Sequence, residues 1–293
     1  MPRNRLAFAA LVLAAFLYGV TFVVVKDAVA AMDPIGFVAW RFMLGGAALA
    51  LLAFPRSAVL WRHGTIAGIF LLGGYSLQTQ GLVTTSASNS GLITGLYVVF
   101  TPLLAAAVAR RIPRLIVVAG ALVAFAGLAA LAAHDGFRLQ EGDAFTIGAA
   151  AAYAAHIVYL SRVALHHPVL PFTAVQTIVT AGGALVMSAA LEGLRAPPAE
   201  VWPAILLTGL AVSAGAVGLQ VWSQTVVGPA RTAVVLALEP AFAAASAAVL
   251  AGERLTARGW LGAGLILAGI YIVLAATKDD DALPAAEAIT PAH

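Results

Sequence analysis

The sequence predicts an all-α polytopic membrane protein, with ten transmembrane helices arranged as two inverted five-helix repeats. Three observations support this fold class. The 293-residue chain is 62% hydrophobic and only 10% charged, whereas soluble domains carry about 25% charged residues. Apolar segments of about 20 residues, the length that spans a bilayer, recur along the whole chain. The second half also repeats patterns of the first half, which predicts two related units.

Composition excludes several other classes of protein. The chain does not show the alternating pattern of outer-membrane barrel strands. It has no cysteine, so disulfides, thiolate metal sites and cysteine nucleophiles are excluded. The net charge of +3 does not indicate nucleic-acid binding, because the basic residues lie at segment ends. Arg3 and Arg5 precede an apolar run that is too long for a signal peptide, so we interpret this run as the first span.

Proline, glycine and charged residues mark the limits of the spans. The loops between them are short, which predicts a compact bundle without a soluble domain. The polar tail at 278–293 contains prolines and is predicted to be disordered. The expected spans are 6–25, 34–54, 64–84, 87–109, 114–133, 144–161, 169–190, 201–222, 228–250 and 257–276.

Lysine and arginine in the loops predict the orientation. If the N-terminus is cytoplasmic, ten of these residues lie in inner segments and five in outer segments, and Arg41 lies inside a span. The loop ARRIPR at 109–114 supplies much of this bias. We therefore expect both termini, and the tail, to be cytoplasmic.

Internal similarity relates the two halves. LYGVTFVVVKD at 17–27 aligns with AYAAHIVYLSR at 152–162, and LITGLYVVFTPLLAAAVA at 92–109 aligns with ARTAVVLALEPAFAAASA at 230–247. We place the repeats at 1–135 and 142–277. Because five spans is an odd number, the second repeat must cross the membrane in the opposite direction. Inverted repeats are typical of secondary transporters, whose binding sites lie near the midplane between the repeats.

The span at 87–109 carries a polar stripe that begins just before it. Five residues fall within about 80° of one another at helical spacing, and side chains of this kind normally face a bundle interior or a wet cavity. Serine and threonine can also bond back to their own helix, so that alternative stays open. The stripe consists of Ser86, Ser90, Thr94, Tyr97 and Thr101, and we assign the last four to a binding cavity.

Glu239 lies near the middle of its span, directly before Pro240. A charged carboxyl group at the bilayer centre costs roughly 3 kcal/mol on insertion scales, so we expect Glu239 to be paired, protonated or functional. Its function would be recognition of an ammonium group or proton coupling. The alternative is a protonated structural glutamate that bonds carbonyl groups freed by Pro240.

Other polar residues occur at equivalent depths in both repeats. Glutamines can also join helices without binding a ligand. His156 could couple protons, since histidine titrates near neutrality, or it could be neutral and bonded to a neighbouring helix. The remaining cavity candidates are Tyr18, Thr21, Tyr75, Gln78, Tyr153, Gln220 and Gln224.

Arg41 lies about two helical turns into the second span. We interpret it as the partner of a carboxylate such as Glu253, with receipt of a substrate carboxylate as the alternative. His166 and His167 are adjacent, and adjacent helical residues cannot both face one metal ion. We therefore assign no metal, no cofactor and no catalytic residue.

The order of these motifs resembles that of paired EamA repeats of the drug/metabolite transporter superfamily, over about residues 6–276. One departure is Tyr18-Gly19-Val20, where the family often has Trp-Gly-Ser/Thr. The resemblance implies a transporter of amino acids, other metabolites or drugs, and it is strongest to amino-acid exporters of bacterial inner membranes. It rests on LYGVTF at 17–22, AWRF at 39–42, TSASNSGLITGLYVVFTP at 85–102, LEP at 238–240 and AGERLT at 251–256.

The candidate cavity lacks the arginine and lysine clusters that phosphate or nucleotide-sugar substrates need, and it lacks an acidic cluster for a divalent metal. Its tyrosines, glutamines and hydroxyl groups suit a small zwitterion. We predict a secondary transporter that exports neutral, mainly hydrophobic or aromatic, amino acids by alternating access. The expected location is a bacterial inner membrane, and the expected partners are the substrate and membrane lipid, without nucleic acid. We expect a monomer or weak dimer.

Three other functions are alternatives. Export of lipophilic or cationic drugs would use Glu239 as the charge partner. An intramembrane enzyme is disfavoured, because the sequence has no His-Glu-x-x-His motif, no Gly-x-Ser-x-Gly motif and no pair of midplane aspartates. A non-transporting membrane subunit would leave the polar face of an inverted repeat unexplained. The sequence contains no ATP-binding loop, which leaves proton antiport or downhill movement as the energy source.

Overall fold

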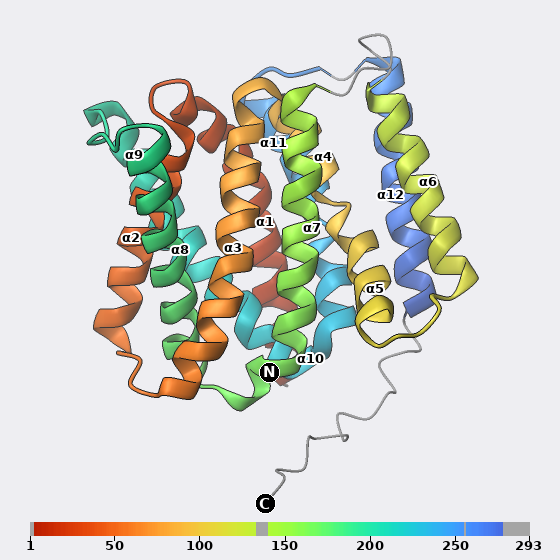
Figure 1. The fold of residues 1–293 in the computed structure, drawn as a ribbon. Helices are drawn as coiled ribbons and strands as arrows, with labels where there is room; N and C mark the ends of the chain where they lie inside the picture. Colours follow the sequence, from red (N-terminus) through yellow and green to blue (C-terminus); the bar gives the residue numbers. More distant parts are fainter. Residues whose placement is uncertain (1–2, 133–139, 255, 278–293) are drawn as a thin grey trace, which may run out of the picture.

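The computed structural model describes residues 3–132, 140–254 and 256–277, which form a bundle of helices joined by short loops (Figure 1). The tail predicted to be disordered, 278–293, lies outside the described residues. The first repeat contains α1 (Arg3–Val29), α2 (Pro34–Leu52), α3 (Ala58–Thr84), α4 (Ala87–Thr94), α5 (Tyr97–Val108) and α6 (Leu115–Ala132). The second contains α7 (Glu141–Val163), η2 (Ala164–His166), α8 (Val169–Leu191), η3 (Ala199–Val201), α9 (Trp202–Leu206), η4 (Leu207–Ala216), α10 (Val217–Leu236), α11 (Glu239–Leu250) and α12 (Ala257–Thr277).

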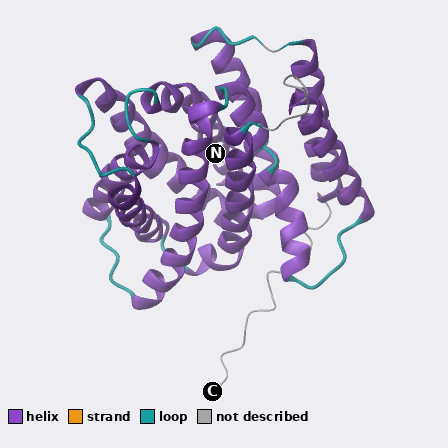
Figure 2. Ribbon diagram, turned by 45° about the horizontal axis from the view of Figure 1, so that its top comes forward, coloured by secondary structure: helices purple, strands orange, loops and turns teal. Residues whose placement is uncertain are grey.

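The fold class predicted from the sequence is confirmed. Every described element is helical (Figure 2). Among the described residues, seven helical segments are long and apolar enough to cross a membrane, and three shorter apolar helices complete a set of ten. The backbone groups of such helices are satisfied within each segment, as a bilayer requires.

Helices at equivalent positions in the two repeats pack against each other. α2 packs against α8, α4 against α11, and α6 against α12. The third span of the first repeat, α3, packs against the first span of the second repeat, α7. In the same way, the first span of the first repeat, α1, packs against η4 and α10 in the third span of the second repeat. Two repeats related by a pseudo-two-fold axis in the membrane plane produce this pattern, and they place a shared interface at the centre of the bundle.

The fourth span of the first repeat is broken near its middle. We expected one helix over 87–109, but α4 ends at Thr94 and α5 begins at Tyr97. The predicted polar stripe is therefore divided between two short helices. At its start, Ser86 caps α4 by accepting a hydrogen bond from the backbone N–H of Asn89 at 3.1 Å, a common helix-capping arrangement.

The second repeat also has a break, and it corrects the expected limits of two spans. We placed a boundary between 201–222 and 228–250, but α10 extends through this region to Leu236. The interruption falls instead at 237–238, directly before Glu239. Pro240 lies in the first turn of α11, a position where its missing N–H costs no hydrogen bond. A carboxyl group thus stands where the helix restarts.

Two glutamates of the second repeat hold helix ends of the first repeat. Glu192 accepts hydrogen bonds from two backbone N–H groups at the start of α2, and Glu253 accepts two at the start of α4, all at 2.8 to 3.0 Å. The first N–H groups of a helix have no partner within it, and the helix dipole favours an anion there. Glu253 is therefore bonded to α4 and is not the partner of Arg41.

Candidate functional site

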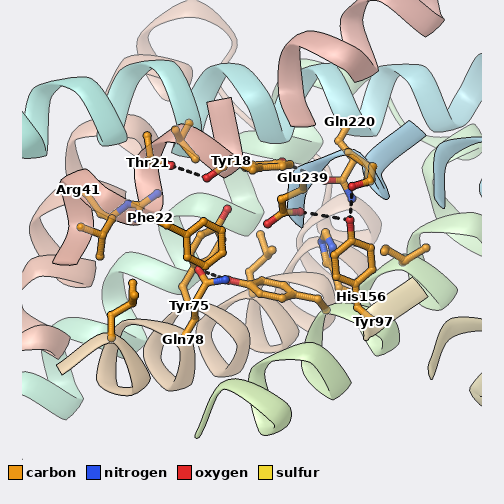
Figure 3. Close-up of a pocket in the computed structure, with 17 residues that line it drawn as sticks. Tyr18, Thr21, Phe22, Arg41, Tyr75, Gln78, Tyr97, His156, Gln220 and Glu239 are labelled. Carbon is orange, nitrogen blue, oxygen red and sulfur yellow. Dashed lines mark hydrogen bonds between the residues drawn. The ribbon is translucent and has the colours of Figure 1, made fainter. Parts of the chain in front are cut away.

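An interior cavity lies between the two repeats. Its lining side chains come from α1, α2, α3, α5, α7, η4, α10 and α11 (Figure 3). The space open to the centre of a water-sized sphere is about 50 Å³, which is room for a few water molecules. This conformation is therefore contracted, and a larger ligand enters only if side chains or helices move.

Nine of the thirteen predicted site residues line this cavity. They come from six different helices of both repeats, so the folded chain brings together residues that are far apart in the sequence. Their role in binding a substrate stays a prediction. They are Tyr18, Thr21, Tyr75, Gln78, Tyr97, Tyr153, His156, Gln220 and Glu239.

The other four predicted residues do not line the cavity. Ser90 and Thr94 on α4 are buried against polar side chains of α7 and α3, respectively. Thr101 donates a hydrogen bond back to the backbone carbonyl four residues earlier, at 2.6 Å, which is the alternative that the stripe left open. Gln224 is buried, and both of its side-chain polar atoms lack a partner among the described residues.

Glu239 and Tyr97 meet at the two helix breaks. The Tyr97 hydroxyl lies 2.9 Å from the Leu236 carbonyl oxygen and 3.2 Å from Glu239 Oε2. A phenol has one hydrogen to donate, and the Leu236 carbonyl lies at the shorter distance. The contact with Glu239 becomes a second hydrogen bond when the carboxyl group carries a proton and donates it to the phenol oxygen. The Leu236 carbonyl has no helical N–H partner four residues later, because that residue is Pro240. The hydroxyl of Tyr97, rather than Glu239, bonds this carbonyl.

Two tyrosines hold two glutamines in equivalent positions of the repeats. Tyr18 donates to Gln220 Oε1 at 2.9 Å, and Tyr153 donates to Gln78 Oε1 at 3.1 Å. The internal alignment matched these tyrosines to each other, and the glutamines lie on the equivalent third and eighth spans. Each tyrosine fixes the orientation of its glutamine amide, so amide N–H groups are held in defined directions beside the cavity.

His156 is bonded to the neighbouring helix. Its Nε2 lies 2.7 Å from Gln176 Oε1, and Gln176 Nε2 in turn donates to the Phe172 carbonyl at 3.3 Å. An amide oxygen only accepts hydrogen bonds, so His156 Nε2 carries the hydrogen. This arrangement matches the structural alternative for His156. Thr21 likewise donates to backbone carbonyls of its own helix.

Arg41 lines the cavity and was not among the predicted site residues. Its Nε donates to Ser213 Oγ at 3.2 Å. Its guanidinium carbon lies 4.9 Å from the ring centroid of Tyr75, 5.4 Å from that of Phe42 and 5.8 Å from that of Phe37. The signal in the sequence was the isolated arginine inside an apolar span, a position that is rarely structural only.

A larger hollow of about 900 Å³ lies at one end of the bundle, between the α1–α2 connection, α3 and the end of α8. Glu192 lines it, but its carboxylate is already bonded to the start of α2. We take the interior cavity as the candidate site, because polar groups from both repeats converge there among apolar side chains.

An all-helical membrane bundle of two repeats, with polar groups converging between them, is typical of transporters. Comparison with known families agrees. The model of the EamA-like transporter family matches residues 5–133 and again residues 140–275. The chain belongs to the EamA-like transporter family.

One similar protein supports this assignment, and a second supports the fold. An uncharacterized transporter of Archaeoglobus fulgidus is 31% identical over 269 residues, which cover 90% of this chain and 84% of the relative. A crystal structure of another protein, 20% identical, matches with a TM-score of 0.67 over 94% of this chain and 98% of its own. The second similarity supports the fold alone.

Proposed function

We propose that this transporter exports neutral amino acids, preferably hydrophobic and aromatic ones, by alternating access around the interior cavity. The observation that carries the proposal is the lining of the cavity. Hydroxyl and amide groups oriented by neighbours stand beside one carboxyl group, Glu239, and between them lie apolar and aromatic side chains. A small amphoteric molecule with an apolar side chain matches these groups.

The lining also argues against other substrate classes. A phosphate or nucleotide sugar would need several cationic side chains, and Arg41 is the only lysine or arginine that lines the described cavity. A divalent metal would need several carboxylates, and no group of three or more acidic or histidine residues suited to a metal occurs among the described residues. A small organic solute remains as the best match.

Alternating access would move one repeat against the other. At one end of the bundle, Glu192 and Glu253 join helices of the second repeat to helices of the first repeat. Within the first repeat, Lys26 donates hydrogen bonds to two carbonyl groups at the end of α3, at 3.0 and 2.9 Å. The contacts of Glu192 and Glu253 would hold that end of the two repeats closed, and their release would open the cavity toward that side. We propose that this end faces the outside of the cell, because the charges in the loops favour cytoplasmic termini, and that the protein lies in a bacterial inner membrane.

Transport by purified protein in proteoliposomes tests the proposal. Labelled leucine, phenylalanine and serine would be compared with the organic cation tetraphenylphosphonium, and empty liposomes would serve as the control. We expect saturable movement of leucine and phenylalanine, weaker movement of serine, and no protein-dependent movement of the cation. Movement of the cation without any amino acid would overturn the proposal in favour of drug export.

A further inference from the structure

Arg41 carries a positive charge that no described side chain neutralises. Its side chain is 2% exposed, and a guanidinium group stays protonated in proteins. Within the described residues, its one hydrogen bond goes to the neutral hydroxyl of Ser213, and its Nη2 atom is buried without a partner. Removing a charge from water without a counter-ion is costly, so this arrangement is incomplete.

The surrounding aromatic rings satisfy only part of this charge. The faces of Tyr75, Phe42 and Phe37 lie within cation–π distance of the guanidinium, and such contacts attract a cation. They do not accept the in-plane N–H groups. The donor at Nη2 therefore still requires an acceptor, and Arg41 borders the cavity.

The backbone holds Arg41 at a fixed place. The π-helical segment η4 packs so closely on α2 that a Cβ atom added at Gly209 would lie 2.8 Å from the Arg41 carbonyl oxygen. A Cβ atom added at Gly45 would lie 2.6 Å from the Gly209 carbonyl oxygen. The same π-helical segment supplies Ser213 to Arg41 Nε. Such segments are rare and often occur at functional sites.

We infer that Arg41 receives the carboxylate of the substrate at Nη2. The inference rests on the proposed function, because it assigns one end of an amino acid to one side of the cavity. Figure 3 shows Arg41 and Glu239 on different sides of the cavity. The amino acid lies with its carboxylate toward Arg41 and its ammonium group toward Glu239 and Tyr97. A cationic drug would meet Arg41 as a like charge.

Binding of matched ligands to purified protein in nanodiscs tests this assignment. Leucine carries both charged groups, leucinamide lacks the carboxylate, and 4-methylpentanoate lacks the ammonium group. The variants are Arg41→Gln, Arg41→Lys and the exposed control Arg162→Gln, which removes an equal charge from a residue that does not line the cavity. Thermal unfolding of each variant shows whether it is folded.

The wild type should bind leucine at least about tenfold more tightly than leucinamide, as expected for loss of a charge-assisted hydrogen bond. Arg41→Gln should abolish this preference and also weaken binding of 4-methylpentanoate. Arg41→Lys should keep part of the preference, and Arg162→Gln should keep all of it. A merely structural role would lower the affinity for all three ligands equally.

Two failures are distinguishable. If the wild type binds and transports no amino acid, the proposed function is wrong, and the inference fails with it. If the wild type binds leucine and folded Arg41→Gln still prefers leucine to leucinamide, the proposed function stands and the assignment of Arg41 is wrong.

Discussion

Glu239 and Arg41 lie on different sides of the cavity (Figure 3). They differ in whether other residues of the protein satisfy their charge and their hydrogen bonds. Glu239 has a partner, since the Tyr97 hydroxyl lies 3.2 Å from its carboxyl group, and a carboxyl group can also become neutral by taking up a proton. In the part of the chain that the structure describes, Arg41 bonds only a neutral hydroxyl, that of Ser213, through Nε. Its Nη2 atom lacks a partner among the described residues, and its charge is permanent. The first side is complete in the absence of substrate, whereas the second side is not.

This difference separates two tasks. A group that can change its protonation state, with a tyrosine that can donate or accept, is suited to coupling transport to protons. A permanent cation with an unsatisfied donor is suited to holding an anionic group. Both sides are positioned by close helix contacts: Glu239 belongs to the helix that packs against Gly19 and Gly95, and Arg41 to the helix that packs against Gly209.

The largest expected effect comes from Glu239→Gln. Glutamine can keep a hydrogen bond to Tyr97, but it cannot take up or release a proton. We expect accumulation driven by an imposed pH gradient to fall at least about tenfold, while exchange without a gradient continues. The measurement is proteoliposome transport of leucine, with the exposed Glu200→Gln as the control. Unchanged gradient-driven accumulation would remove Glu239 from the coupling step.

His156→Ala provides the contrast within the same assay. Because His156 is already bonded to Gln176, we expect the variant to lose stability and keep its response to the pH gradient. A variant that folds normally and loses the gradient response would instead place the coupling at His156. If both Glu239→Gln and His156→Ala keep gradient-driven transport, neither residue couples protons.

Alanine substitutions at Gly95 and Gly209 should disturb the Glu239 side and the Arg41 side of the cavity separately. A Cβ atom at Gly95 would lie 2.5 Å from Pro240 Cγ, and one at Gly209 would lie 2.8 Å from the Arg41 carbonyl oxygen. Overpacking of this kind costs about 1–3 kcal/mol. Gly209→Ala should weaken binding of 4-methylpentanoate most, and Gly95→Ala should weaken binding of leucinamide most.

Gly182→Ala is the matched control for these two variants. Nothing lies within 4 Å of a Cβ atom at this helical position, so its stability should be unchanged or slightly raised. Calorimetry and the nanodisc binding assay measure both effects. If Gly95→Ala and Gly209→Ala change the binding of all ligands equally, the two sides of the cavity do not act separately.

A smaller effect is expected for Tyr97→Phe. The substitution removes the hydroxyl that donates to the Leu236 carbonyl and contacts Glu239, and an unsatisfied buried polar group costs about 1–3 kcal/mol. Tyr18→Phe removes one hydrogen bond to Gln220 and should cost less. The free energies of unfolding, measured under the same conditions, test this order. Equal losses would show that Tyr97 does not hold the Glu239 side together.

The smallest effect concerns a contact between two histidines at the end of the bundle opposite Glu192. His63 Nδ1 lies 2.8 Å from His167 Nε2, and partial burial, with His63 and His166 nearby, lowers the pKa of His167 below its ordinary value of 6.5. A lowered histidine pKa stabilises the folded protein fully above about pH 6.5, and this contribution is lost as the pH falls below that value.

His167→Gln therefore separates this response from that of the cavity. Between pH 7.5 and 5.5, the wild type should lose more in Tm than the variant. Transport driven by a pH gradient should be the same in both proteins. A loss of gradient-driven transport in His167→Gln would show that the pH response does not arise in the cavity alone.

Hydropathy and internal similarity predicted the bundle because both follow from the local composition of each span. They did not locate the breaks at 95–96 and 237–238, because hydropathy and similarity report the composition of a segment and not where its backbone hydrogen bonds are interrupted, as they are before Pro240. The polar stripe from Ser86 to Thr101 was predicted to face a cavity, but Tyr97 is its only member that lines the described cavity. The other members are satisfied by a helix cap, by neighbouring helices or by their own backbone.

Arg41 marks the limit of sequence-based prediction at the site. Its position in an apolar span indicated importance, but the choice between a structural pair and a ligand contact depended on where Glu253 lies. The fold bonds Glu253 to the start of α4 and leaves Arg41 beside the cavity. The π-helical segment that supplies Ser213 is likewise invisible in a hydropathy pattern.

The most direct test of the account is a distance between substrate and protein. Solid-state NMR can measure dipolar coupling between leucine labelled with ¹³C at its carboxyl carbon and ¹⁵N-labelled arginine side chains in lipid. The account predicts a coupling that corresponds to about 4 Å between the carboxyl carbon and a guanidinium nitrogen, and loss of this coupling in Arg41→Lys. Bound leucine without such a coupling, or a coupling that persists in Arg41→Lys, would contradict it.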